Sequence, residues 1–175
     1  MFEKLTDRSS IGGWIFQGGV MSDGKVTGGK TKCGSNFTLY EREIYKNWED
    51  HSRGIPGLGE MHGRHFLKEM AGFTGCAISI HSLPPGAGMP IRHAHEKNEE
   101  VYIVIQGQGQ MQIDGEILDV REGSIVRVLP DGQRAWRNNS TEPLLYIVAQ
   151  MKESSPSQYG LRKEITSGNG RDWIN

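Results

Sequence analysis

Two histidines and a carboxylate form the group of residues in this chain that could do chemistry. His93 and His95 stand two positions apart, and Glu100 begins the next apolar run. Alternate residues of an extended segment face the same side, so the two imidazoles should project together. Imidazole nitrogens and a carboxylate oxygen suit a divalent ion such as Zn²⁺, Fe²⁺, Mn²⁺ or Ni²⁺. The spacing therefore predicts a metal site of His93, His95 and Glu100, with the identity of the metal left open.

Three further side chains are candidates for the same site. By strand alternation, Tyr102 shares the face of Glu100, so it is predicted to line a cavity and contact a ligand; the alternative is a packing aromatic with a polar tip. His81 on the preceding strand and Gln150 on the last strand are candidate fourth metal ligands, with hydrogen bonds away from the site as the alternative.

Short strands are the elements that must position these residues. Glycine supplies 24 of 175 residues, which favours strands and tight turns over helices. Asp114-Gly115 predicts a type I′ hairpin turn, because both central residues of that turn need a positive φ. Turn signals separate eight strand-like runs, 73–83, 91–95, 101–105, 111–113, 117–120, 124–129, 135–138 and 144–151. Their spacing predicts an antiparallel sandwich or barrel.

The flanks of this region differ from it in composition. We expect a strand-rich unit over 61–152, an irregular extension over 1–60 that packs on this unit or on a partner subunit, and a polar tail over 153–175. Within the extension, 36–44 is a candidate strand, 41–50 a candidate pair of helical turns, and 51–60 a loop.

Composition argues against several classes of function. The formal net charge of −1 and the absence of a basic run give no reason to expect nucleic acid. No apolar run approaches the roughly 20 residues that span a bilayer, and 1–8 does not resemble a secretory signal. The expectation is a cytoplasmic protein with no membrane partner, in which Cys33 and Cys76 are reduced thiols.

The segment 84–107 resembles the first signature of the cupin superfamily, which has a glycine, a His-x-His pair, a glutamate and a second glycine. Four residues separate His95 from Glu100, and six separate Glu100 from Gly107, as in that signature. The opening glycine, Gly86, is one residue farther from His93 than is usual in the signature.

The segment 123–139 is similar to the second cupin signature. Pro130, Gly132 and Asn139 are in register, and the gap from Gly123 to Pro130 is one residue long. In this alignment Ala135 stands where the family has its third metal histidine. The resemblance spans about half of the chain, roughly 73–151.

The resemblance implies an all-β fold, a double-stranded β-helix (the cupin jelly-roll barrel), with its site inside near one mouth. It also implies a homodimer formed through amino-terminal segments such as 14–16 and 36–44. With Ala135 on the cavity side, alternation places Arg137 there too, as a candidate to bind a substrate carboxylate or phosphate. Arg92 and Arg134 are expected at the rim, and the alternative for all three arginines is exposure to solvent.

Two functions follow from these expectations. The first is a metal-dependent protein that binds a small polar or anionic molecule and performs isomerase- or dioxygenase-type chemistry. The second is a non-catalytic cupin that binds or senses a small ligand through a degenerate metal site, which the alanine at position 135 motivates. The sequence leaves open whether the protein is an enzyme.

Overall fold

The computed structural model describes residues 30–41, 52–55 and 59–154. Strands make up all of its regular elements except one four-residue helix, so the predicted all-β class is confirmed. In chain order the elements are β1 (Lys30–Cys33), β2 (Thr38–Glu41), β3 (Ser52–Ile55), β4 (Gly59–His62), β5 (Arg64–Phe66), α1 (Lys68–Ala71), β6 (Ala77–Leu83), β7 (Asn98–Gln106), β8 (Gln108–Ile113), β9 (Glu116–Arg121), β10 (Ile125–Val128), β11 (Arg134–Arg137) and β12 (Leu144–Lys152).

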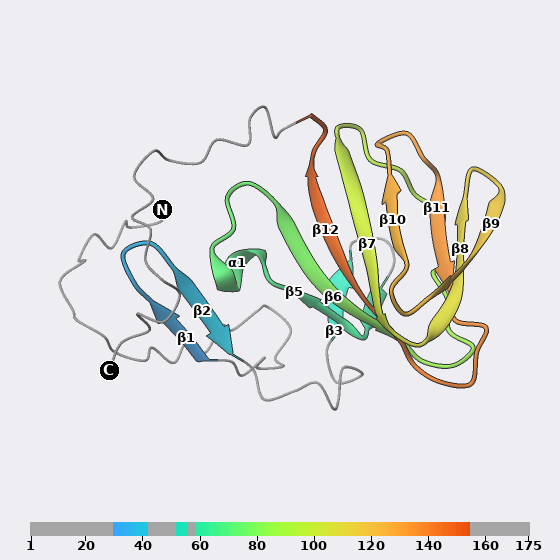
Figure 1. Cartoon of the computed structure of the whole chain (residues 1–175), viewed down its shortest axis with the longest axis horizontal. Coiled ribbons are helices and arrows are strands. Elements are labelled where there is room, and N and C mark those ends of the chain that lie inside the picture. Colours follow the sequence, from blue (N-terminus) through green and yellow to red (C-terminus); the bar gives the residue numbers. More distant parts are fainter. Residues whose placement is uncertain (1–29, 42–51, 56–58, 155–175) are drawn as a thin grey trace, which may run out of the picture.

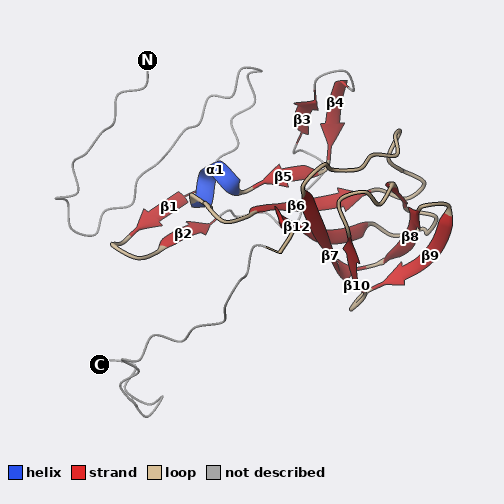
Figure 2. Ribbon diagram, turned by 90° about the horizontal axis from the view of Figure 1, so that it is seen from above, coloured by secondary structure: helices blue, strands red, loops and turns tan. Residues whose placement is uncertain are grey.

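Two antiparallel sheets form the barrel (Figures 1 and 2). The larger sheet has the order β10-β7-β12-β6-β5 and the smaller one the order β11-β8-β9. From β7 in the larger sheet the chain enters the smaller sheet as β8 and β9 and returns to the larger sheet as β10. It then crosses to the smaller sheet again as β11, and β12 completes the larger sheet. This alternation between two facing sheets is the jelly-roll arrangement that the sequence predicts. Two hairpins, β1-β2 and β3-β4, lie outside both sheets.

The core lies between the two sheets and is rich in aromatic rings. Tyr102 from β7, Trp136 from β11 and Tyr146 from β12 are each at most 4% exposed. The Trp136 and Tyr146 rings stack with centroids 4.5 Å apart and an interplanar angle of 8°. Burying large rings supplies much of the apolar area that stabilises a small barrel. Aliphatic side chains fill the remaining core, among them Leu83, Val104, Met111, Val128, Leu144 and Val148.

The turn between β8 and β9 has the backbone conformation that its sequence predicts. Asp114 has φ 50° and Gly115 has φ 95°, so both central residues are left-handed, as the Asp-Gly pair predicts. The side chain of Asp114 also accepts a hydrogen bond of 2.9 Å from the Gln133 backbone N–H. The turn therefore fixes the register of the smaller sheet against the loop that precedes β11.

Three predicted elements are wrong in extent or type. The segment 91–95 is not a strand, because it meets β11 through one bridge, His93 to Arg134, rather than a ladder. The strand predicted over 73–83 begins only at Ala77, since α1 and its left-handed cap Gly72 precede it. The loop predicted over 51–60 contains the hairpin of β3 and β4.

Several predictions lie outside the described residues. These are the apolar segment 14–16, the helical turns from 42 to 50, and the tail beyond Ser154. The strand predicted over 36–44 is present in part, as β2. Within the described ranges, no helix has the length and apolar character needed to cross a membrane.

Candidate functional site

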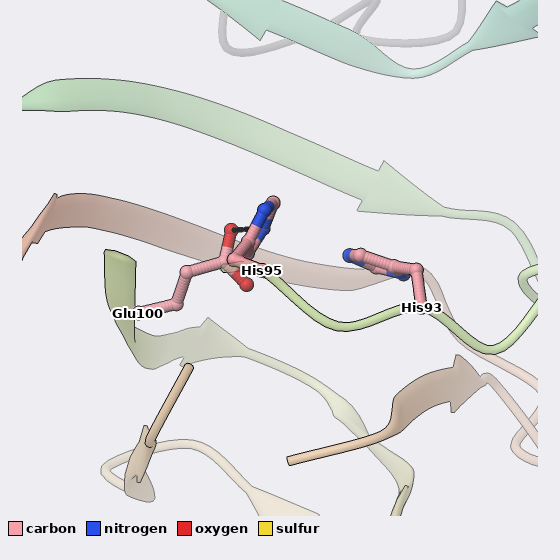
Figure 3. Close-up of side chains that lie close together, drawn as sticks. All are labelled: His93, His95 and Glu100. Carbon is pink, nitrogen blue, oxygen red and sulfur yellow. Dashed lines mark hydrogen bonds and ion pairs between the residues drawn. The ribbon is translucent and has the colours of Figure 1, made fainter. Parts of the chain in front are cut away.

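The three predicted metal ligands converge at one end of the barrel (Figure 3). One ligand atom from each of His93, His95 and Glu100 lies within 4.8 Å of the others. The Nε2 of His95 is 3.0 Å from Oε1 of Glu100, and the His93 ring extends toward this pair. Two residues of a loop and one of β7 thus form a compact cluster of two imidazoles and one carboxylate.

Backbone hydrogen bonds to β11 and its preceding turn hold the histidine loop in place. The His93 N–H donates to the Arg134 carbonyl at 3.2 Å, and the Arg134 N–H donates to the His93 carbonyl at 3.0 Å. The His95 N–H donates to the Pro130 carbonyl at 2.9 Å. These bonds give 93–95 an extended path without a full strand, so both imidazoles still reach the same region.

Glu100 is buried and already holds a set of donors. Its Oε2 accepts hydrogen bonds from Arg134 Nε at 3.0 Å and Arg134 Nη2 at 2.8 Å, and one from the Tyr102 hydroxyl. Burial alone would raise the pKa of Glu100, but the bonds from Tyr102 and Arg134 outweigh it and the pKa lies below its ordinary value. The carboxylate is therefore ionised, with Oε1 turned toward His95.

Arg134 is a buried structural cation, and its predicted place at the rim is wrong. Its side chain is fully buried and donates to the Gly132 carbonyl at 2.7 Å as well as to Glu100. A charge-assisted pair of this kind fixes the position of both partners. Arg134 thus orients the Glu100 carboxylate.

Of the two candidate fourth ligands, Gln150 adjoins the cluster and His81 bonds elsewhere. The side-chain amide nitrogen of Gln150 lies 3.0 Å from Nε2 of His95. His81 Nε2 is paired with the Ser79 hydroxyl at 2.8 Å, and the His81 ring stacks on Tyr146 with centroids 5.1 Å apart. A fourth protein donor, if one is used, is therefore Gln150.

A cavity of about 520 Å³ opens beside the cluster. This volume is in the range of small-molecule sites in proteins. Its walls carry the cluster, the predicted Tyr102, and the stacked pair of Trp136 and Tyr146. Aliphatic side chains, including Ile78, Ile91 and Val148, complete the lining. The cavity thus combines an apolar surface with a few polar groups.

Three of these lining residues have a buried nitrogen without a hydrogen-bond partner among the described residues: Nδ1 of His81, Nδ1 of His93 and Nε1 of Trp136. Folded proteins leave few such groups unpaired. Burial, followed by the charge of Arg64, lowers the pKa of His81 to about 3. Burial, followed by the charge of Arg134, lowers the pKa of His93. Both imidazoles are therefore neutral at neutral pH.

The cluster fits a divalent metal ion. The neutral imidazole of His93 and the ionised carboxylate of Glu100 are in the protonation states that bind metal. The separation of 3.0 Å between His95 Nε2 and Glu100 Oε1 equals the spacing of ligands 90° apart around an octahedral ion with bonds of about 2.1 Å. Nδ1 of His93 has no competing partner among the described residues. Arg134 and Tyr102 bond to Oε2 of Glu100, so the partner of Oε1 is His95, which belongs to the cluster itself.

Arg137 does not face the cavity, so this part of the prediction is wrong. The Arg137 side chain is exposed, and its Nε donates to the Gln110 side chain at 2.6 Å. On β11 the residues that point inward are Arg134 and Trp136, because Trp136 pairs with the fully buried Met111 of β8. Side chains of β11 do alternate between the two faces, but the inward set is Arg134 and Trp136 rather than Ala135 and Arg137.

Comparison with known proteins supports the fold and names the family. The family model described as "Cupin domain" matches residues 79–149. A cupin protein from Bacteroides fragilis is 35% identical, and the match covers 59% of this chain and 87% of that one with a TM-score of 0.56. The chain belongs to the cupin superfamily.

Other solved structures share the cupin fold at lower identity. A cupin 2 conserved barrel domain protein from Salinispora arenicola is 16% identical over 66% of this chain and 90% of its own, with a TM-score of 0.52. A protein from Photorhabdus luminescens is 18% identical over 64% and 87%, with a TM-score of 0.51. No curated protein matches this chain.

Within the cupin barrel, the residue that reaches the metal cluster from β11 is Arg134 and not Ala135. Ala135 lies on the face of β11 opposite Arg134 and Trp136. The buried asparagine that closes this segment is Asn138, which donates to the Leu83 carbonyl at 2.8 Å. The fully buried residues of this segment are thus Arg134 and Asn138, each one position before the residue that the spacing from Gly132 predicts to point inward.

Sequence reasoning missed Arg64, Trp136 and Tyr146 as residues of the cavity. With Ala135 taken as an inward residue, alternation places its neighbour Trp136 on the outward face. Tyr146 lies in a run that is apolar throughout, so it carried no signal of its own. Arg64 comes from β5, which has three residues and is too short to show a period.

Proposed function

We propose that this cupin binds a divalent metal ion through His93, His95 and Glu100 and a small polar or anionic molecule in the adjoining cavity. The observation that carries the proposal is the convergence of these three side chains, within 4.8 Å, in the wall of a cavity of about 520 Å³. A bound ion would supply Lewis-acid chemistry of the isomerase or dioxygenase type. A homodimeric assembly and a cytoplasmic location, both expected from the sequence, belong to the same proposal.

Each residue of the chain has a distinct part in this proposal. His93 and His95 donate ring nitrogens, and Glu100 donates Oε1. Arg134 and Tyr102 hold Oε2 and so keep the carboxylate ionised and oriented. The apolar walls exclude water around the bound molecule, which strengthens polar contacts within the site.

Metal titration tests the proposal. The chelated protein is titrated with Mn²⁺, Fe²⁺, Zn²⁺ and Ni²⁺ in separate calorimetric experiments. We expect one equivalent to bind, and His93→Ala to weaken binding by at least tenfold because a neutral donor is lost. His62→Ala is the matched control, since His62 is exposed and lies outside the cavity lining. Equal affinity in the wild type and His93→Ala would contradict the proposal.

A second candidate function is metal-free ligand binding by a non-catalytic cupin. One observation favours it: both Glu100 oxygens already have protein partners, with His95 on Oε1 and Arg134 and Tyr102 on Oε2. In this case a ligand would raise the melting temperature equally with and without chelator. Loss of that stabilisation on chelation would exclude this candidate.

A further inference from the structure

Arg64 is a buried cation in the wall of the cavity. The residue is 7% exposed and comes from β5, at the edge of the larger sheet. Its Nη2 donates to the thioether sulfur of Met89, which is a weak acceptor. Among the described residues, no ion pair joins Arg64 to a carboxylate. A guanidinium has five N–H donors, and Met89 is the one acceptor of Arg64 among the described residues, so the other donors remain for water or a ligand in the cavity that Arg64 lines.

A largely buried guanidinium with one weak acceptor carries a desolvation cost that a bound anion would offset. Removing a charge from water without a partner carries a large desolvation cost. Burial lowers the pKa of Arg64, but a guanidinium stays protonated in proteins. The charge is also felt by its neighbours, since Arg64 helps to lower the pKa of His81 and of His93. The cation therefore lies close to the candidate metal cluster.

The charges around the cavity sum to a positive value. Glu100 is the single carboxylate among the described lining residues, and the buried Arg134 neutralises it. Arg64 and the exposed Lys68 line the same cavity without an ion pair to a described carboxylate. The complementary ligand consequently carries negative charge.

The surroundings of Arg64 distinguish between kinds of anion. A planar guanidinium matches the two oxygens of a carboxylate. A phosphate group is usually held by several cations or by backbone N–H groups at a helix terminus, whereas Arg64 is the one buried cation of the described lining, since Lys68 is exposed. The remaining walls are aromatic and aliphatic, with Trp136 and Tyr146 stacked and Ile91 and Val148 beside them.

From this charge, burial and shape we propose that Arg64 binds the carboxylate of a small carboxylic acid whose apolar body contacts the aromatic wall of the cavity. The inference rests on the proposed function in one respect, namely that the cavity binds a small molecule. It does not depend on whether His93, His95 and Glu100 hold a metal ion.

Ligand titration with three probes of one shape tests the assignment. Phenylacetate, phenylacetamide and phenyl phosphate are titrated into the full chain and followed by calorimetry and by amide chemical shifts. We expect phenylacetate to bind at least about tenfold more tightly than the other two probes, and Arg64→Gln to lose that preference. Arg137→Gln is the matched control, because Arg137 is an exposed arginine outside the cavity lining and should leave binding unchanged.

Thermal unfolding distinguishes an arginine that binds a ligand from one that stabilises the fold. Arg64→Met retains an unbranched apolar chain in place of the arginine stem and removes the unpaired charge. Without ligand, this variant should melt at the same temperature as the wild type or above it. It should also lose the stabilisation by phenylacetate.

Three binding results would overturn the proposal. They are equal binding of phenylacetate and phenylacetamide, unchanged phenylacetate binding in Arg64→Gln, and tighter binding of phenyl phosphate than of phenylacetate. A large fall in the melting temperature of Arg64→Met would also overturn it, since Arg64 would then be structural. Titrations with chelator and with Mn²⁺ separate this inference from the metal site: a failed metal site leaves the Arg64-dependent preference intact, and loss of that preference leaves metal binding intact.

Discussion

Arg134 determines the shape of the candidate metal site, because it orients the carboxylate that two histidines face. It is fully buried, whereas the neighbouring pair of Arg127 and Glu99 has an arginine side chain that is 57% exposed. In both pairs Nε and Nη2 of the arginine contact one carboxylate oxygen, at 3.0 and 2.8 Å in the first pair and at 2.6 and 2.5 Å in the second. They should nevertheless contribute very differently to stability, since exposed pairs are solvated and screened.

Arg134→Gln should lower the free energy of unfolding by roughly 3–5 kcal/mol, because it leaves Glu100 buried without its counter-charge. Arg127→Gln should cost at most about 1 kcal/mol, since its pair is exposed. Urea denaturation of both variants measures the difference. The double variant Arg134→Gln/Glu100→Gln should regain part of the loss, and equal costs for Arg134→Gln and Arg127→Gln would refute this account of the pair.

At the scale of elements, the turn between β7 and β8 depends on a glycine for two reasons. Gly107 has φ 80°, and a Cβ there would lie 2.3 Å from the Pro143 carbonyl oxygen. Gly123 has a similar φ of 86°, but a Cβ there would meet nothing within 4 Å. Comparing the two separates backbone strain from a steric clash.

Gly123→Ala should cost about 1–2 kcal/mol of unfolding free energy, which is the strain of a left-handed alanine. Gly107→Ala should cost clearly more, because the backbone of the loop before β12 must also move. Urea denaturation midpoints check this order. Equal losses of unfolding free energy in the two variants would mean that the loop at Pro143 moves away from the new Cβ at no energetic cost.

The sequence predicted the pairing of elements more accurately than the faces that these elements turn toward the cavity. The spacing of His93, His95, Glu100 and Gly107 reflects local geometry, so these residues were placed together correctly. The face of β11 depended on counting from Gly132, and an offset of one residue exchanges all inward and outward side chains. That offset arises in a loop and is fixed by tertiary contacts such as the bonds of Asn138, which have no local signature.

At the scale of the whole molecule, the buried polar groups of the cavity make stability depend on pH. His81 is buried between β5 and β12, where it faces Arg64 and the ring of Tyr146, and its pKa is lowered to about 3. Burial raises the pKa of Tyr146, so that group stays neutral. The unfolded chain takes up a proton at His81 near pH 6.5, whereas the folded chain does not until near pH 3.

Stability should therefore fall as the pH drops below about 6.5, and this contribution continues to be lost until about pH 3. His81→Gln removes the titrating group and retains an amide that can reach Ser79. Between about pH 7.5 and pH 5, this variant should lose about 2 kcal/mol less unfolding free energy than the wild type. The exposed His62→Gln variant should behave as the wild type. Identical pH dependence in His81→Gln and the wild type would show that His81 is protonated in the folded protein.

The position of Arg64 has a consequence for how such a protein diversifies. β5 pairs only with β6 in the larger sheet, and Arg64 precedes the residues 79–149 that the cupin family model matches. The candidate metal cluster, by contrast, lies within the matched residues. If Arg64 binds the ligand as proposed, a substitution in β5 would change which molecules bind and leave His93, His95 and Glu100 unaltered. Ligand preference and metal binding could then change independently in this barrel.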